Sequence, residues 1–378
     1  MKKKIIIFSE FPLSALSGES SGRGGGQAAT WLPQLARAWE TCSEFEIHWA
    51  VFDRNADKPE IITALNQTFH RLPCPSISVS LLLARWPHRL AAKSLIRHVQ
   101  PDLIHVWGTE NLFGAALQEF DGHSVLSMQG IITTYFKTGD LTGWRWRLFR
   151  FWEPRSILKA TVITCESKWG MNQVASIVDQ KCMRRIEYGV SPSFFDVKWC
   201  PDAAKPRILF VGGLNRLKGI DLLINVLKKY PALPWRLVFI GSGYLEEELR
   251  NLHHPSVELL GMLKTNQVQE EMSKAWAFVI PSRADTSPNV VKEARVIGLP
   301  VIGSKNGGHA EYIDNGKDGF IVAGCEPECW YQALNALGTN YERCRLMGSL
   351  NQSKYREYFR PEKTADEFVK LYREMLAM

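Results

Sequence analysis

The chain has 378 residues, of which 45% are hydrophobic and 22% are charged. This composition is that of an ordinary globular protein, and the length is too great for one typical α/β core, so we expect two domains of about 150 to 200 residues. No apolar run approaches the roughly 20 residues that a membrane-spanning helix needs, so the sequence predicts no such helix.

The net charge is +7. It favours an anionic partner such as nucleic acid, anionic lipid or a nucleotide diphosphate, although an evenly basic surface explains it as well. The eight cysteines form no C-x2-C pair and have no histidine at zinc-finger spacing, so we expect reduced thiols and no metal site. Met1 to Lys4 resembles the start of a signal peptide, but the apolar stretch after it ends at Phe8, so we expect a cytoplasmic protein.

The N-terminal half alternates short apolar runs with longer amphipathic stretches, which is typical of βαβ units on a parallel sheet. The predicted strands are residues 4–8, 46–51, 103–106, 124–127 and 161–165, and the predicted helices include residues 80–99 and 144–159.

A glycine-rich stretch follows the first predicted strand and includes Gly24, Gly25 and Gly26. Such a loop lets backbone N–H groups approach a phosphate or a sugar closely, so we expect a ligand-binding loop here; a plain surface loop is the alternative. It lacks the Gly-Lys-Ser/Thr of a P-loop and the spacing of a dinucleotide-binding loop.

Basic and aromatic residues alternate from Trp144 to Trp152. This pattern suits a helix that rests on an anionic membrane, a platform that stacks on single-stranded nucleic acid, or a core helix with arginine stems along its edges. All three interpretations stay open at the level of sequence.

A second βα series starts near residue 208, where an apolar strand again ends in glycine. Residues 191–206 show little periodicity, so we place a linker there, between a domain over residues 1–190 and one over 207–358. The predicted strands are 208–211, 236–240, 257–259, 277–280 and 301–302; the predicted helices are 220–229, 245–252 and 266–275, one from residue 287, and two at the C-terminus.

A buried strand, a polar turn and a helix are predicted to meet at Asp285, at the strand end where open α/β sheets bind ligands. We expect Ser287 to cap the helix, with the proline after it at the first helical position. The backbone N–H groups of Asn289 and Val290, at the positive end of the helix dipole, then suit a phosphate. Glu293 lies on the same face as Asn289, so its carboxylate can accept hydrogen bonds from sugar hydroxyls.

Two cations, Arg216 and Lys218, lie between a predicted strand and a predicted helix. A cation here can neutralise charge on a departing diphosphate, and at about 4 Å with an effective dielectric near 20 one such contact is worth roughly 4 kcal/mol. Solvated loop charges are the alternative. Gly241 ends the next strand in a glycine turn, but no third glycine follows at dinucleotide spacing, which disfavours an NAD site. His309 lies in another glycine loop expected at the same edge.

Taken in this order, these segments resemble the C-terminal domain of the retaining family-4 glycosyltransferases of GT-B architecture. The matching segments are residues 210–219, 240–243, 260–261, 281–283, 298–302 and 307–319. The N-terminal half fits more loosely, and residues 359–378 look like the helix that crosses back onto the N-terminal domain in this fold. The resemblance implies an α/β protein of two Rossmann-like, doubly wound domains that face each other across a cleft.

The resemblance also implies the chemistry: a nucleoside-diphosphate sugar as co-substrate, a glycan or lipid-linked acceptor, retained configuration at the anomeric carbon, and neither a cofactor nor a metal. On this pattern Lys218 and an arginine bind the diphosphate, Glu293 holds the ribose and Asp285 contacts the donor sugar. The remaining donor-site residues are Gly212, Gly213, Gly241, Ser287, Asn289 and Val290.

Three residues depart from the family's pattern. Asp285 stands where glutamate is usual. Gly213 stands where an arginine usually follows the glycine, so we assign that role to Arg216. Gln129 stands where a histidine is often found near the sugar, and a glutamine can hydrogen-bond a hydroxyl but carries no charge.

These departures keep open a non-catalytic binder of nucleotide sugars or glycans. A sugar-nucleotide epimerase of GT-B fold, which would need no acceptor, is the alternative among enzymes. The leading prediction is a glycosyltransferase of cell-surface polysaccharide or glycolipid synthesis. We expect it in the cytoplasm or at the inner face of the membrane, where it would make peripheral contact with anionic lipid, and we expect no nucleic-acid partner.

Overall fold

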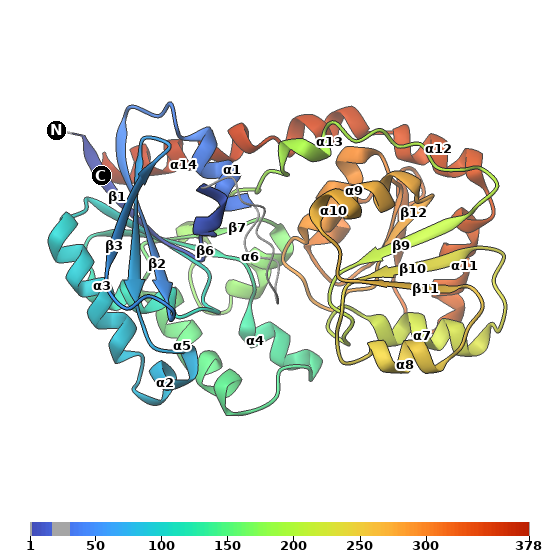
Figure 1. Ribbon diagram of the computed structural model, residues 1–378, viewed down its shortest axis with the longest axis horizontal. Coiled ribbons are helices and arrows are strands. Elements are labelled where there is room, and N and C mark those ends of the chain that lie inside the picture. Colours follow the sequence, from blue (N-terminus) through green and yellow to red (C-terminus); the bar gives the residue numbers. More distant parts are fainter. Residues whose placement is uncertain (1, 17–30, 378) are drawn as a thin grey trace. The chain divides into compact units, whose positions relative to one another are not determined.

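A computed structural model describes residues 2–16 and 31–377 (Figure 1). The chain divides into two compact units. Unit 1 comprises the chain up to Lys137, then Leu141–Gly189 and the residues from Pro361 onward, and unit 2 comprises Thr138–Asp140 and Val190–Arg360. Within the described ranges, no helix is both long and apolar enough to cross a membrane.

Unit 1 is built on one sheet in the order β3-β4-β2-β1-β5-β6-β7-β8. Its strands are β1 (Lys3–Phe8), β2 (Phe45–Asp53), β3 (Glu60–Ala64), β4 (Gln67–Pro73), β5 (Leu103–Trp107), β6 (His123–Met128), β7 (Val162–Cys165) and β8 (Met183–Arg185). β3 pairs antiparallel with β4, whereas the other pairings of this sheet are parallel. Strands β3, β4 and β8 were not predicted from the sequence.

The helices of unit 1 are α1 (Trp31–Ala38), α2 (Ile77–Leu82), α3 (Trp86–Val99), α4 (Ile132–Tyr135), α5 (Trp144–Lys159), α6 (Lys168–Val174) and α14 (Pro361–Leu376). The last helix, α14, completes the core of this unit although it is far away in the chain. The indole of Trp39 donates to the carbonyl of Ala365 at 3.2 Å, and the buried His105 ring lies 2.6 Å from the Tyr372 hydroxyl.

The single helix predicted over residues 80–99 is instead two helices, α2 and α3, joined by a sharp turn. Ala84 and Arg85 adopt left-handed backbone conformations, with φ of 50° and 65°. The side chain of Arg85 turns inward, is almost fully buried, and lies over the ring of Trp152 at 3.9 Å. This tertiary contact holds a backbone conformation that non-glycine residues rarely adopt alone.

Unit 2 is a six-stranded parallel sheet in the order β11-β10-β9-β12-β13-β14. The strands are β9 (Arg207–Val211), β10 (Arg236–Ile240), β11 (Val257–Gly261), β12 (Ala277–Ile280), β13 (Val301–Ser304) and β14 (Gly319–Val322). The helices are α7 (Ile220–Lys229), α8 (Glu246–Asn251), α9 (Thr265–Lys274), α10 (Asn289–Ile297), α11 (Pro327–Gly338), α12 (Tyr341–Ser349) and α13 (Gln352–Tyr358). This is the strand order of a Rossmann fold.

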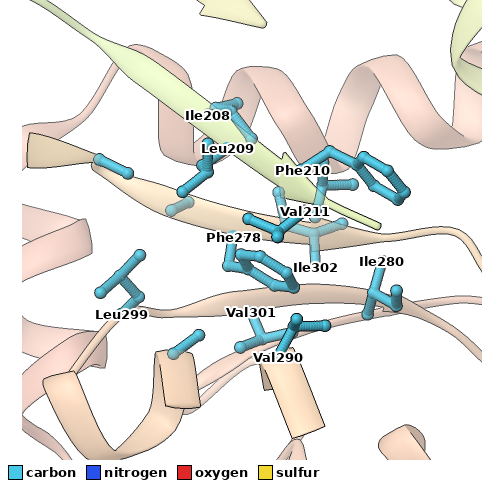
Figure 2. Packing of buried hydrophobic residues seen from close by; sticks show 14 of the residues in the cluster. Ile208, Leu209, Phe210, Val211, Phe278, Ile280, Val290, Leu299, Val301 and Ile302 are labelled. Atoms are coloured by element: carbon cyan, nitrogen blue, oxygen red, sulfur yellow. The ribbon is translucent and has the colours of Figure 1, made fainter. Parts of the chain in front are cut away.

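The central strands of unit 2 are apolar almost throughout, as expected for a parallel sheet that is covered on both faces. Figure 2 shows side chains of β9, β12 and β13 packed together, with Val290 of α10 against Val301. Residues 191–206, predicted as a linker, lie along unit 2, where the indole of Trp199 donates to the carbonyl of Ala275 at 2.7 Å. This core fixes the strand ends from which the functional loops emerge.

Candidate functional site

In unit 2 the strand order reverses between β9 and β12, which are hydrogen-bonded neighbours. The loop after β9 leads to α7 and the loop after β12 leads to α10. Because the helices that follow these two strands diverge from the reversal point, their loops lie side by side at the carboxyl edge. The predicted site residues Lys218 and Asp285 are in these two loops.

The structure brings Lys218 and Asp285 into direct contact. The Lys218 ammonium forms an ion pair with the Asp285 carboxylate, and the backbone N–H of Lys218 donates to Asn215 Oδ1 at 2.9 Å. The side chain of Lys218 is 28% exposed and that of Asp285 is 10% exposed, so the ammonium can still be reached from outside. The sequence placed both residues at this edge but did not predict that they bind each other.

A second ion pair, which was not predicted from the sequence, joins the loop after β12 to the first turn of α7. The guanidinium of Arg283 makes two bonds of 2.6 Å to the carboxylate of Asp221 and a third, also of 2.6 Å, to the carbonyl of Arg216. The side chain of Arg216, predicted to bind a diphosphate, is exposed and forms no ion pair with any described residue. A guanidinium that binds a carboxylate through two bonds holds it in a fixed plane, so Arg283 fixes the loop that carries Arg216.

Glycines allow the loops to approach this closely. Gly241 has a φ of 134°, and a Cβ there would lie 2.0 Å from the carbonyl oxygen of Gly212. Gly212 in turn donates its backbone N–H to Ile240 at 2.9 Å. At Gly213 an added Cβ would lie 2.8 Å from the amide nitrogen of Asn215. Gly212, Gly213 and Gly241, predicted as donor-binding residues, thus also have a packing role.

The predicted cap of α10 is wrong. The helix begins at Asn289, with Pro288 at the cap position and no side-chain cap. Ser287 is buried, and its hydroxyl lies 2.6 Å from the hydroxyl of Tyr312. The hydroxyl pairs with this distant tyrosine and forms no cap, because the helix begins one residue later than predicted and Pro288 occupies the cap position.

The predicted anion site at the start of α10 keeps its donors. The backbone N–H groups of Asn289 and Val290 make no hydrogen bond to any described residue, whereas that of Val291 donates to the carbonyl of Pro288 at 3.0 Å. The side-chain Oδ1 of Asn289 is buried without a hydrogen-bond partner among the residues described. A buried polar atom without a partner is costly, so this end of α10 is suited to a polar ligand.

Glu293 follows one turn later on α10 and is partly buried. Burial raises the pKa of its carboxyl to about 7, against the opposing effect of the Lys292 charge. A carboxyl near its pKa at neutral pH can accept hydrogen bonds from the vicinal hydroxyls of a sugar.

His309 lies in the short helix η6 (Gly308–Tyr312), which follows β13. It is fully buried, and its Nε2 lies 2.9 Å from the carbonyl oxygen of Ser304. A carbonyl only accepts, so Nε2 carries the proton and Nδ1 presents a lone pair. Nδ1 is buried without a hydrogen-bond partner in the described ranges. Burial lowers the pKa of His309 to about 4, although the charge of Asp285 raises it, so the ring is neutral at physiological pH.

The remaining predicted residues belong to unit 1. Gln129 follows β6, beside Gly108 and Glu110: a Cβ on Gly108 would lie 3.4 Å from Gln129 Oε1 and 2.7 Å from Glu110 Oε2. Glu110, which the sequence analysis did not select, accepts the backbone N–H of Gly130 at 2.6 Å, and burial raises the pKa of its carboxyl to about 7. The predicted acceptor loop at 24–26 lies outside the described residues.

Taken together, the unit 2 groups offer two cations, Lys218 and Arg216, free backbone donors at a helix start, and two carboxyls. They suit a phosphorylated sugar ligand. No group of three or more potential metal ligands occurs among the residues that the structure describes.

Two Rossmann-like parallel-sheet domains in one chain define the GT-B fold of glycosyltransferases. Solved structures agree: the chain is similar to sucrose-phosphate synthase from Thermosynechococcus elongatus (TM-score 0.80, 17% identity, 100% of each chain). It is also similar to the catalytic domain of starch synthase IV from Arabidopsis thaliana bound to ADP and acarbose (TM-score 0.73, 13% identity, 100% of each chain). A third similar structure is Anabaena Alr3699/HepE with UDP and glucose (TM-score 0.68, 14% identity, 98% of this chain and 100% of that one).

The family comparison concerns unit 2. Residues 205–340 match the family model described as "Glycosyl transferases group 1". The sulfoquinovosyl transferase SQD2 of Arabidopsis thaliana is 30% identical over 159 residues, which are 41% of this chain and 31% of that protein. The D-inositol 3-phosphate glycosyltransferase of Corynebacterium urealyticum is 30% identical over 183 residues, 45% of this chain and 43% of that protein. The chain thus spans less than half the length of these relatives.

Proposed function

We propose that the protein is a retaining glycosyltransferase that moves a sugar from a nucleoside-diphosphate sugar to a glycan or lipid-linked acceptor in cell-surface polysaccharide or glycolipid synthesis, without a metal. One observation carries the proposal: at the strand reversal of unit 2, the Lys218 ammonium forms an ion pair with the Asp285 carboxylate. In the glycosyltransferase pattern that this chain resembles, the acid at this position contacts the donor sugar. The family match over residues 205–340 covers all of these residues.

The donor would bind by its diphosphate first. The free N–H groups of Asn289 and Val290 lie at the positive end of the α10 dipole and suit phosphate oxygens. The Lys218 ammonium would turn from Asp285 toward the diphosphate and stabilise the negative charge that grows there as the bond to the anomeric carbon breaks. The exposed Arg216 can add a second cation, and the Glu293 carboxyl would hold the ribose hydroxyls.

The sugar itself would be read by Asp285 and His309. With Lys218 turned to the diphosphate, the Asp285 carboxylate accepts a hydrogen bond from a sugar hydroxyl. The neutral His309 ring presents the Nδ1 lone pair, which accepts a second one and so gains the partner that it lacks. Each such bond rejects a sugar that lacks the matching hydroxyl, because a buried acceptor is then left without a donor.

The acceptor would be served by unit 1, where Gln129 and Glu110 follow neighbouring strands. The glutamine amide can donate to and accept from hydroxyls but adds no charge. This set suits a hydroxyl-bearing acceptor better than an anionic one, because the nearest charge is a carboxyl.

The test is turnover of nucleotide sugars by the purified protein with a panel of glycan and lipid-linked acceptors. Wild type is compared with Lys218→Ala and Glu293→Ala, and with Lys228→Ala as a matched control, since Lys228 is a surface lysine of the same domain. Equal rates in all four proteins would refute the site. Donor isomerisation without acceptor would instead indicate an epimerase, and tight donor binding without any turnover a non-catalytic binder.

A further inference from the structure

The turn between α2 and α3 exposes a continuous set of apolar side chains. Leu82 is 72% exposed, Leu83 51% and Trp86 59%, and Ala84 between them is exposed too. We call these four residues the apolar tip. Singly exposed apolar residues are common on protein surfaces, but four in one turn form a patch of the kind that marks an interaction site.

The tip is held outward by the fold and does not hang loose. The left-handed backbone at Ala84 and Arg85 reverses the chain, and the buried Arg85 side chain ties the turn to Trp152 of α5. Below the tip, Leu81 of α2 and Phe149 of α5 belong to one buried apolar cluster. The inward anchor lets the neighbouring leucines point away from the core.

Helix α5 adds positive charge next to this turn. Figure 1 shows α2 beside α5, and the two helices are in contact. Arg145, Arg147, Arg150 and Arg155 are exposed along α5, together with the aromatic rings of Trp144 and Phe151. The acidic residue of this helix, Glu153, is buried and hydrogen-bonded to backbone N–H groups of α4.

The charge of α2, the tip and α3 is of one sign. Residues 77–99, which form these elements, contain Arg89, Lys93 and Arg97 besides the buried Arg85, and no aspartate or glutamate. Arg89 and Lys93 share one partner, Glu119, so the pairing leaves a net positive charge. An apolar tip flanked by cations is complementary to a bilayer whose headgroups are anionic.

We propose that the apolar tip inserts Leu82, Leu83 and Trp86 into the headgroup region of an anionic bilayer, while the exposed arginines of α5 bind lipid phosphates. The inference rests on the proposed function, in that the bilayer would carry a lipid-linked acceptor to unit 1. Single-stranded nucleic acid would also use the exposed aromatic rings of this surface, but it fits less well because it gains little from the exposed leucines.

The experiment is flotation of the full-length protein with vesicles of phosphatidylcholine alone, or of phosphatidylcholine mixed with phosphatidylglycerol. Wild type should float with the mixed vesicles and less with the neutral ones. The double variant L82D/L83D should lose about 100-fold or more in its partition constant, about tenfold for each leucine removed from the apolar phase. Arg147→Glu should weaken binding only at low salt, because exposed charges are screened.

Two variants in unit 2 serve as matched controls. Leu346 is 60% exposed on α12, and Arg345 is exposed beside it, so Leu346→Asp and Arg345→Glu make the same changes away from the tip. Both should float as wild type does. Hydrogen exchange of residues 77–90 adds a measurement on the unaltered protein: amides there should exchange more slowly once mixed vesicles are present.

Several outcomes overturn the inference. They are failure of wild type to float with either vesicle, equal flotation of L82D/L83D and wild type, or unchanged exchange at the tip. Binding to a single-stranded oligonucleotide that depends on the arginines but not on the leucines would reassign the surface. Turnover with a water-soluble acceptor separates the two proposals: a protein that turns over donor but ignores vesicles refutes only the membrane contact.

Discussion

Replacing Lys218 by alanine tests the site most directly. The change removes the ammonium that lies on Asp285 and, in the proposed reaction, the cation that stabilises the departing diphosphate. We expect kcat/KM for the donor to fall sharply while the fold is retained.

The magnitude follows from the geometry. A unit charge about 4 Å from the diphosphate is worth roughly 4 kcal/mol at an effective dielectric near 20, which corresponds to about 10³-fold in rate. Because the Lys218 side chain is 28% exposed, solvent screens part of this, and we expect a loss of about 10² to 10³-fold. Leaving Asp285 without its partner should also lower the free energy of unfolding by about 1 to 3 kcal/mol.

The assay separates these two effects. Turnover and urea unfolding are measured for Lys218→Ala, for Asp285→Asn and for the double variant. The double variant should recover stability relative to Lys218→Ala, since no charge is left unpaired, yet should stay inactive. The control Lys228→Ala breaks an ion pair to Glu248 between side chains that are 52% and 44% exposed, and should change stability by no more than about 1 kcal/mol and leave turnover unchanged. Wild-type turnover by Lys218→Ala, together with reduced stability, would show that the lysine is only structural.

Three further predictions concern the surroundings of this pair. Burial raises the pKa of Glu293 from 4.5 to about 7, so the stability linked to its neutral form is present below pH 4.5 and is lost as the pH rises through about 7. Glu293→Gln stays neutral, so the difference in melting temperature between this variant and wild type should grow in favour of the variant from about pH 5 to about pH 8. A difference that does not change with pH would contradict this prediction. Arg283→Ala should lower the free energy of unfolding by about 1 to 3 kcal/mol and raise KM for the donor, and a double-mutant cycle with Asp221→Ala should show coupling between the two residues. Additive losses would argue against a structural role of the Arg283–Asp221 ion pair. Gly241→Ala should lower the free energy of unfolding by about 3 kcal/mol or more, because the added Cβ meets a backbone oxygen. Gly261→Ala, with a φ of 67° and open space around it, should lower it by only about 1 to 2 kcal/mol. Equal melting temperatures of the two variants would show that the close approach at Gly241 is not needed.

Much of the fold could be predicted from the sequence, because a strand or helix is set by neighbours in the chain. The apolar runs located the strands of unit 2 to within a few residues, apart from β14, and helix α5 has the bounds that its pattern predicted. The weaker signals failed. β3 is a short edge strand with mostly exposed side chains, so it lacks the alternation of apolar and polar residues that predicts a strand.

The sequence also predicted that Lys218, Asp285, Asn289 and Glu293 lie near one edge of the sheet, since strand ends of a parallel sheet share one edge. Of these residues, Lys218 and Asp285 are in direct contact. The structure alone decided how they are used: Ser287 turns to Tyr312 and leaves the helix uncapped, and Lys218 closes on Asp285. These partners lie 25 and 67 residues apart in the chain, so no local pattern encodes them.

The same distinction holds for the apolar tip. The sequence shows leucines, a tryptophan and arginines in a helical pattern and predicts one continuous helix over residues 80–99. The structure breaks that helix just before Pro87, which lies in the first turn of α3 and cannot donate the backbone hydrogen bond that a continuous helix needs. The contact of the buried Arg85 with the ring of Trp152, far along the chain, then decides how the turn packs. Composition and periodicity fix which segments are apolar, whereas the packing of distant segments decides which of those apolar residues remain exposed to meet a partner.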